Sequence, residues 1–230
     1  MILTKVTNMA SIVAITVSTN YHDILPIVYH YNRDFFKHWV FVTDKNDNET
    51  IKFLSDKPNV TILYWDFKNE RRQFDKGGAI RNAQYYVYDK FPDEWYVLID
   101  SDIVLPAKTQ KFLIAEIPKI NQAPGISEVA IFGAEKRLDF SRLSDLISEN
   151  NYIVYDQKNY LCGYFQMYKE KYFYSPSRDA SVCDIDFCGY FKKPFHMKDL
   201  ICYHLGRNSA HWKGDRIFGS DFVIDVKLPK

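Results

Sequence analysis

Two aspartates separated by one serine are the residues of this chain best suited to chemistry. Asp100 and Asp102 follow the apolar run 95–99, and apolar residues resume at once at 103–105. Because an unpaired charge in apolar surroundings is very costly, these carboxylates need a cationic partner. A hard divalent cation suits both carboxylate and phosphate oxygens. The pattern therefore predicts a site that binds Mn²⁺ or Mg²⁺ together with a diphosphate.

A solvated turn, in which Asp100 caps the following segment, is the simpler alternative. Asp-x-Asp alone is a common pattern and carries little information. Here it stands between two apolar runs that are typical of short buried strands. A surface turn is rarely enclosed in this way, so the flanking residues favour a binding site.

The elements that must position these carboxylates alternate between strands and helices. Apolar runs typical of buried strands occupy 11–17, 38–43, 60–64 and 95–99. Helices are expected at about 23–33 and 74–88, with a short helix before the third strand. This alternation predicts an α/β fold with a mostly parallel central sheet flanked by helices. In open α/β sheets, ligands bind at the carboxyl ends of the strands, where Asp100 stands.

The second half of the chain carries further elements. Strand-like runs occur at 127–133, 162–168 and 200–205, and a helix can begin at 184–190. The stretches 114–122 and 137–150 fit neither pattern clearly. No repeat, low-complexity block or linker interrupts the chain, so we expect a single domain over residues 1–230.

Composition and charge fit one globular domain. The 230 residues are 47% hydrophobic and 26% charged, which is an ordinary balance. The net charge of +1 gives no electrostatic argument for nucleic acid, although a local basic patch stays open. Segment 11–17 is too short to span a bilayer, and 1–10 lacks the order of a signal peptide. We therefore expect a cytoplasmic protein without a transmembrane segment, with peripheral membrane contact left open.

Four cysteines lie in the last third of the chain: Cys162, Cys183, Cys188 and Cys202. They lack the paired spacing of a zinc site. Reduced, buried thiols are the expected state, and one disulfide remains an alternative.

The order of these features resembles that of the GT-A glycosyltransferases. In chain order the matching features are Ser18-Thr19-Asn20, Asp44, the helical run 76–82, Asp100-Ser101-Asp102, and the segments 163–168, 183–187 and 203–206. The order is most similar to that of the galactosyltransferase and chondroitin-polymerase type. The resemblance implies a nucleotide-sugar-binding half at about 11–105, an acceptor-side half at about 106–214 and a C-terminal tail at 215–230.

The resemblance implies a donor-binding role for residues of several elements. These are Thr16, Ser18, Asn20, Asp44, Lys76, Arg81, Asp100, Ser101, Arg207, Trp212 and Lys213. The stretch 16–20 would lie along the nucleotide, commonly a uridine nucleotide, and Asp44 would accept a hydrogen bond from its base. Without the resemblance, Arg81 fits an exposed helix residue in a surface pair. The pair Gly77-Gly78 allows close approach of a ligand, but also fits an ordinary turn.

Asp102 and His204 are the metal ligands that the resemblance implies, with Mn²⁺ or Mg²⁺ as the cofactor. A lone histidine at the end of an apolar strand is usually a packed core residue. Here the upstream aspartates need a further ligand, and imidazole suits Mn²⁺. His211 is a second candidate. In the same late segment, Arg207 and Lys213 could neutralise the departing diphosphate while Trp212 stacks on a sugar.

The resemblance implies that Asp184 occupies the second acid position of the family's catalytic segment, which is the general base, and Asp186 of the same segment is the other catalytic candidate. Transfer of a sugar with inversion needs a carboxylate that takes the proton of the acceptor hydroxyl. Cys183 departs from the family, which usually has Glu there, and this departure affects the contact with the acceptor. Alternatively, Asp184 caps a helix whose first turn is acidic, and both roles can coexist.

These features predict a metal-dependent glycosyltransferase that moves a sugar from a nucleotide-sugar donor to a hydroxyl acceptor. The acceptor is open: carbohydrate, lipid-linked sugar, protein and modified nucleobase all fit. A retaining glycosyltransferase is the first alternative, because the late His-Leu-Gly segment also resembles retaining members. A nucleotidyltransferase would be expected to carry a glycine-rich basic loop after the first strand, which residues 18–21 are not. A sugar-binding module without turnover is the non-enzymatic alternative.

Overall fold

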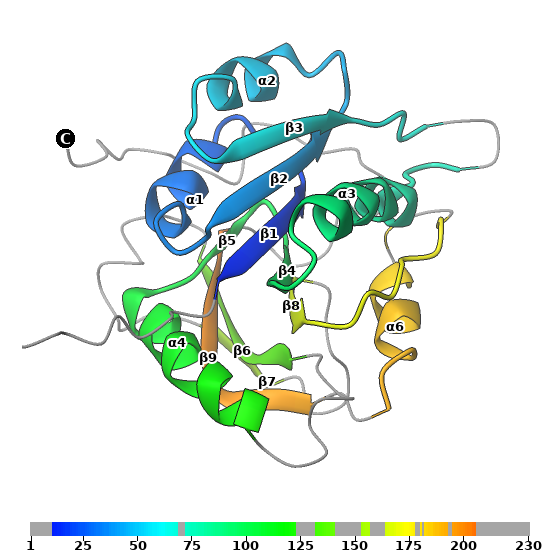
Figure 1. Cartoon of the computed structure of the whole chain (residues 1–230). Coiled ribbons are helices and arrows are strands. Elements are labelled where there is room, and N and C mark those ends of the chain that lie inside the picture. Colours follow the sequence, from blue (N-terminus) through cyan, green and yellow to red (C-terminus); the bar gives the residue numbers. More distant parts are fainter. Residues whose placement is uncertain are drawn as a thin grey trace, which may run out of the picture.

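A computed structural model describes residues 11–68, 72–122, 132–140, 153–156, 164–177, 180, 182–192 and 195–205. One mixed sheet runs through these residues in the order β3-β2-β1-β4-β8-β6-β9-β5, and β7 pairs with β6 (Figure 1). Helices flank the sheet on both sides (Figure 1). The predicted α/β class is confirmed.

The first four strands form the parallel part of the sheet. They are β1 (Ile12–Val17), β2 (His38–Thr43), β3 (Val60–Tyr64) and β4 (Trp95–Ile99), and every pairing among them is parallel. The connecting helices are α1 (Leu25–Asn32), α2 (Asn48–Leu54) and α3 (Lys76–Lys90). The strands and helices predicted for this half are confirmed, because their apolar periodicity is strong and local.

The second half of the sheet is mixed. It comprises β5 (Ile103–Val104), β6 (Phe132–Phe140), β7 (Ile153–Asp156), β8 (Phe165–Tyr168) and β9 (Phe195–Leu205), with helices α4 (Ala107–Gln122) and α6 (Cys183–Cys188). Strand β8 runs antiparallel to β4, and β5 runs antiparallel to β9, whereas β6 and β9 are parallel. The stretch 114–122, which fitted no clear pattern, is the second part of α4. Of the predicted strand at 127–133, only 132 and 133 fall among the described residues.

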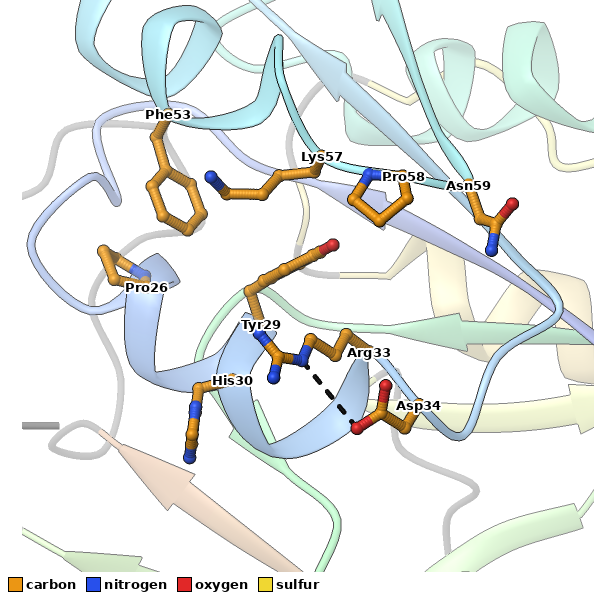
Figure 2. A pocket seen from close by; sticks show the side chains of 9 residues that line it. All are labelled: Pro26, Tyr29, His30, Arg33, Asp34, Phe53, Lys57, Pro58 and Asn59. Carbon is orange, nitrogen blue, oxygen red and sulfur yellow. Dashed lines mark ion pairs between the residues drawn. The ribbon is translucent and has the colours of Figure 1, made fainter. Parts of the chain in front are cut away.

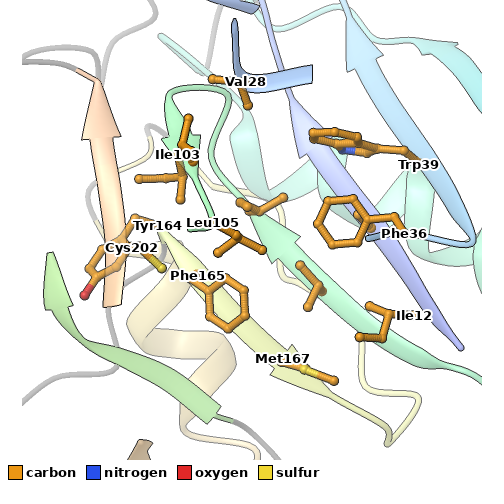
Figure 3. Packing of buried hydrophobic residues seen from close by; sticks show 14 of the residues in the cluster. Ile12, Val28, Phe36, Trp39, Ile103, Leu105, Tyr164, Phe165, Met167 and Cys202 are labelled. Atoms are coloured by element: carbon orange, nitrogen blue, oxygen red, sulfur yellow. The ribbon is translucent and has the colours of Figure 1, made fainter. Parts of the chain in front are cut away.

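Alternate residues of each central strand face two separate apolar cores. On β4, Trp95, Val97 and Ile99 belong to one core, whereas Tyr96 and Leu98 belong to the other. The first core also contains side chains of α1 and α4, and Figure 3 shows part of it. The second contains side chains of α3 and α6. A strand buried on both faces is apolar throughout, which explains the continuous apolar run before Asp100.

The three cysteines among the described residues, Cys183, Cys188 and Cys202, are free thiols. This agrees with the expected reduced state for these three, and Cys162 lies outside the described residues. No helix in the described part of the chain is long and apolar enough to cross a membrane.

Candidate functional site

The aspartate pair forms a tight turn between β4 and β5. The Asp100 amide donates to the Tyr164 carbonyl at 3.1 Å, and the Ile103 amide donates to the Asp100 carbonyl at 3.2 Å. Asp102 is only 7% exposed and Ser101 only 3%. The alternative of a solvated surface turn is therefore wrong for these two residues, although 35% of the Asp100 side-chain surface stays exposed.

Asp102 and His204, the two predicted metal ligands, lie side by side. Their facing atoms, Oδ2 and Nε2, are 3.1 Å apart. The antiparallel pairing of β5 with β9 brings them together, because Ile103 is the register partner of His204. The Leu205 amide also donates to the Asp102 carbonyl at 2.7 Å, which ties the turn to the end of β9.

The chemistry of this pair suits Mn²⁺ or Mg²⁺. A carboxylate and an imidazole are both suitable ligands for Mn²⁺. In the described part of the chain, no group of three or more His, Cys, Asp or Glu side chains is arranged to hold a metal ion. Diphosphate oxygens and water are common further ligands of Mg²⁺ in phosphate sites.

Lys76 links the aspartate turn to the predicted catalytic segment. Its Nζ lies 2.9 Å from Asp100 Oδ1 and 3.4 Å from Asp184 Oδ2, and the Lys76 side chain is 11% exposed. Burial alone would lower the pKa of the ammonium group, but the two carboxylates raise that pKa well above its ordinary value. Burial raises the pKa of Asp100, against the opposing effect of Lys76. Lys76 is therefore a charged, buried bridge between two carboxylates.

Asp184 is held by groups from three other segments. Its Oδ1 lies 3.1 Å from the Tyr174 hydroxyl, its Oδ2 faces Lys76, and its carbonyl accepts from Gln166 Nε2 at 3.1 Å. Burial raises the pKa of Tyr174 well above its ordinary value, so its hydroxyl stays a neutral donor. The helix-cap alternative is wrong in its strict form, because Val182 is the N-cap of α6 and makes no side-chain cap. Asp184 still benefits from the helix dipole, since it lies in the first turn.

Asp186 lies two positions further along α6 and is exposed. At about 100° per residue, its side chain stands about 200° around the helix axis from that of Asp184. The two predicted acids of this segment therefore face different surroundings, with Asp184 in the cluster and Asp186 toward solvent.

Gln166 and Tyr174 belong to the cluster but were missed by the sequence reasoning. The Tyr174 hydroxyl lies 2.5 Å from Gln166 Oε1, and Gln166 is fully buried on β8. A glutamine inside an apolar strand was the available signal, because a buried amide needs partners. Tyr174 carried no such signal in this tyrosine-rich chain.

Thr16, near the end of β1, and Ser18, directly after it, stand at the same carboxyl edge of the sheet. Thr16 is buried, donates to the Ile99 carbonyl at 2.8 Å and accepts from Trp39 Nε1 at 2.9 Å, so it joins neighbouring strands. Ser18 is fully buried, and its hydroxyl has no hydrogen-bond partner among the residues that the structure describes. A buried hydroxyl of this kind is a place where a ligand or water would find a hydrogen bond.

Asn20 and Asp44 lie in the loops beyond these strands. Asn20 is exposed with φ 61°, and its amide donates to Asp47 Oδ2 at 2.7 Å. Asp47 also caps α2 by accepting from the Thr50 amide at 3.2 Å. Asp44 accepts from the Asn46 amide at 2.8 Å. Asp47, which sequence reasoning did not single out, therefore fixes the loop that carries Asn20.

Arg81 projects from α3 and pairs with a residue one turn further on. Its Nη2 lies 3.3 Å from the Tyr85 hydroxyl, and its guanidinium carbon lies 5.8 Å from the centre of the Tyr85 ring. This is the surface pair considered as its alternative role.

The glycine pair lies inside the first turn of α3 and is approached by the chain itself. A Cβ on Gly77 would stand 2.1 Å from the Ser175 carbonyl oxygen. The Gly77 amide and the Ser177 hydroxyl are 3.1 Å apart. Asp75, the N-cap of α3, accepts from the Gly78 and Ser177 amides, both at 2.9 Å. The glycine pair therefore does not form an ordinary turn. It lets the segment before α6 pack closely against the start of α3.

Three predicted donor-binding residues, Arg207, Trp212 and Lys213, lie outside the described residues, as does the second candidate ligand His211.

A cavity of about 420 Å³ lies elsewhere, between α1 and the segment before β3 (Figure 2). Its lining is Pro26, Tyr29, His30, Arg33, Asp34, Phe53, Lys57, Pro58 and Asn59. Arg33 precedes β2 and Asn59 precedes β3, whereas Asp100 follows β4. Because these strands are parallel, the cavity lies toward the amino ends of the strands, and it contains none of the predicted site residues.

No family model and no curated protein matches this chain. Among solved structures, it is similar to HddC from Yersinia pseudotuberculosis, with 14% identity, 81% of this chain and 90% of that chain covered, and a TM-score of 0.42. A putative nucleotide-diphospho-sugar transferase from Desulfovibrio desulfuricans G20 shows 10% identity, coverage of 82% and 80%, and a TM-score of 0.37. The chain is also similar to 4-diphosphocytidyl-2C-methyl-D-erythritol synthase from Anaerococcus prevotii, with 11% identity and a TM-score of 0.34. That match covers 56% of this chain and 54%, about half, of the other chain.

All three TM-scores are below 0.5, so the fold class of this chain rests on its own sheet and helices. What the chain can do chemically rests on the cluster at the carboxyl end of β4.

Proposed function

We propose that this protein is a metal-dependent glycosyltransferase of GT-A-like architecture, related in its motif order to the galactosyltransferase and chondroitin-polymerase type. It would move a sugar from a nucleotide-sugar, with UDP-sugars first among the candidates, to an acceptor hydroxyl. One observation carries the proposal, at the end of a buried strand. Asp100 contacts Lys76, which also contacts Asp184, and Asp102 contacts His204. Carboxylates, an ammonium and an imidazole gathered at this edge suit a diphosphate and a divalent cation.

On the donor side, Asp102 and His204 would hold Mn²⁺ or Mg²⁺. The metal would supply positive charge that stabilises the nucleoside diphosphate as it leaves. Asp100 and Ser101 would contact the ribose and sugar, with the nucleotide along Thr16, Ser18, Asn20 and Asp44. The buried Ser18 hydroxyl, which has no partner in the described part of the chain, supports a ligand at this edge. Arg81, Arg207, Trp212 and Lys213 complete the proposed donor set.

On the acceptor side, Asp184 would take the proton of the acceptor hydroxyl as that oxygen attacks the anomeric carbon. Attack from the face opposite the leaving diphosphate inverts the anomeric configuration. The contacts of Asp184 with Tyr174 and Lys76 support this role, because a positioned carboxylate is what general-base catalysis needs. Asp186, which is exposed, would contact the acceptor rather than take part in the proton transfer.

Incubation with a panel of nucleotide sugars and Mn²⁺, followed by product analysis, tests the function. Transfer or slow hydrolysis that releases a nucleoside diphosphate and a sugar of inverted configuration is the expected result. A product of retained configuration indicates the retaining mechanism, and pyrophosphate release from a nucleoside triphosphate indicates a nucleotidyltransferase. Tight binding of a sugar without any turnover would make the protein a binding module.

A further inference from the structure

Lys76 stands where local electrostatics disfavour a lysine. It is the first residue of α3, and the amino end of a helix carries partial positive charge that repels an ammonium group. Its side chain is also buried. Burial costs free energy because it desolvates the charge and because it restricts the rotamers of a long side chain. Lys90, in the last turn of the same helix, has the favourable placement, with 58% of its side chain exposed. A lysine that is buried at the amino end of a helix goes against local preference, and such exceptions are expected at functional sites.

Two carboxylates offset this unfavourable placement. Asp100 and Asp184 are 24 and 108 residues away in sequence, and both have an oxygen within 3.4 Å of Lys76 Nζ. Asp184 Oδ1 is meanwhile engaged by Tyr174. With one oxygen on the hydroxyl and the other on the ammonium, the Asp184 carboxylate has a single orientation. Without Lys76, the negative charges of Asp100 and Asp184 would repel each other in a poorly solvated space.

We propose that Lys76 is a positioning residue whose ammonium group ties the donor-side carboxylate of Asp100 to the acceptor-side carboxylate of Asp184. The short helix α6 carries Asp184, but Lys76 sets where that carboxylate stands relative to the aspartate turn. The role of Asp184 as general base rests on the proposed function, whereas the tie itself does not. Loss of the ammonium would therefore misplace the base more than it would weaken donor binding.

The first test needs no turnover. Melting temperatures are measured for Lys76→Met, Asp184→Asn and the double variant in the complete protein. Each single change lowers the melting temperature, Lys76→Met by on the order of 5 °C or more, as for a broken buried ion pair. The double variant loses clearly less than the sum of the two losses in melting temperature, since the repulsion between the Asp100 and Asp184 carboxylates is then gone. Strictly additive losses overturn the proposal.

A surface ion pair of the same chain is the matched control. Lys37 Nζ and Glu94 Oε1 are 2.6 Å apart, and half of the Lys37 side chain is exposed. The cycle of Lys37→Met and Glu94→Gln should show coupling of about 1 °C or less. Should Lys76→Met fail to fold, Asp100→Asn and Asp184→Asn are combined with Lys76 intact. The melting temperature of their double variant should fall by more than the sum of the two single decreases, because the buried ammonium is then left without a counter-ion. Additive decreases would overturn the proposal.

The second test uses sugar transfer. Lys76→Met should lower kcat by roughly 10-fold or more with the donor KM within about twofold, because a misplaced base slows chemistry more than binding. Lys76→Arg, which keeps the charge, should restore a large part of kcat, and Lys90→Met should match the wild type. A raised donor KM with unchanged kcat overturns the proposal and leaves Lys76 as a phosphate-binding residue. If the wild type transfers no sugar, the proposed function is wrong. The melting temperatures still test whether Lys76 holds Asp100 and Asp184 together.

Discussion

At the scale of single residues, a substitution of Asp102 is the most direct test of the proposed metal site. Its carboxylate faces His204 at 3.1 Å in a nearly closed space. We expect Asp102→Asn to abolish Mn²⁺-dependent binding of the nucleotide sugar, because an amide oxygen carries no charge for the metal. Calorimetric titration with and without EDTA measures this, and circular dichroism checks that the fold is intact. Full-strength donor binding by the wild type in EDTA would contradict the metal site.

Asp184 separates catalysis from binding at the same scale. Asp184→Asn keeps the size and the contact with Tyr174 but removes the proton acceptor. Transfer should fall by roughly 10²-fold or more, the usual scale for a lost general base. Donor affinity should stay near the wild-type value. Steady-state kinetics with varied donor and acceptor measure both.

Asp186→Asn is the matched control for that measurement, because it makes the same change on the exposed side of α6. It should raise the acceptor KM and leave kcat nearly unchanged. If Asp184→Asn transfers sugar at the wild-type rate, Asp184 is not the base.

At the scale of elements, the contact between α3 and the segment before α6 decides how the site is assembled. Gly77→Ala would place a Cβ 2.1 Å from the Ser175 carbonyl, so the segment must shift. We expect a loss of about 1–3 kcal/mol, the usual scale of overpacking. Denaturant titration of the unfolding free energy measures it.

Gly189→Ala is the control for this contact. Its Cβ would stand 3.2 Å from the Asp186 carbonyl, and its φ of −63° suits any residue. Its effect should be clearly smaller than that of Gly77→Ala. Equal losses of unfolding free energy in the two variants would mean that the packing at the start of α3 does not require a glycine at position 77.

At the scale of the whole molecule, a buried tyrosine network joins the two halves of the sheet. Tyr96 on β4 packs against Tyr168 on β8 and Tyr88 on α3, and its hydroxyl donates to the Phe91 carbonyl at 2.7 Å. Burial, followed by the nearby Asp93 and Glu94, raises the pKa of Tyr96 to about 12. Burial also raises the pKa values of Tyr88 and Tyr168.

This network predicts a loss of stability at alkaline pH. A pKa above the unfolded value of about 10 means that the folded state holds the proton more tightly. The stabilisation is therefore complete below about pH 10 and declines as the pH rises toward 12. Denaturant unfolding from pH 8 to 12 should show this decline, and Tyr96→Phe should flatten it. An unchanged slope in Tyr96→Phe would contradict the role of Tyr96.

Much of the first half could be predicted, because its signals are local. Apolar runs and helical periods over a few residues placed β1 to β4 and α1 to α3. The same periodicity left α4 unrecognised, since Pro118 lies inside the helix and its residues are mixed in polarity. The reason for Gly77 was not predictable locally, because the atom that a Cβ would meet there is the Ser175 carbonyl oxygen, nearly 100 residues away.

The sequence by itself determined that a buried strand ends in Asp100 and Asp102, and that these carboxylates need a cationic partner. Only the tertiary structure decided which cations and donors reach them. His204 meets Asp102 because β5 pairs with β9, and Lys76 meets Asp184 because α6 packs beside α3. Local patterns follow from contacts within one turn or one strand. Pairings across 108 residues follow instead from the order of strands in the sheet, which no local pattern encodes.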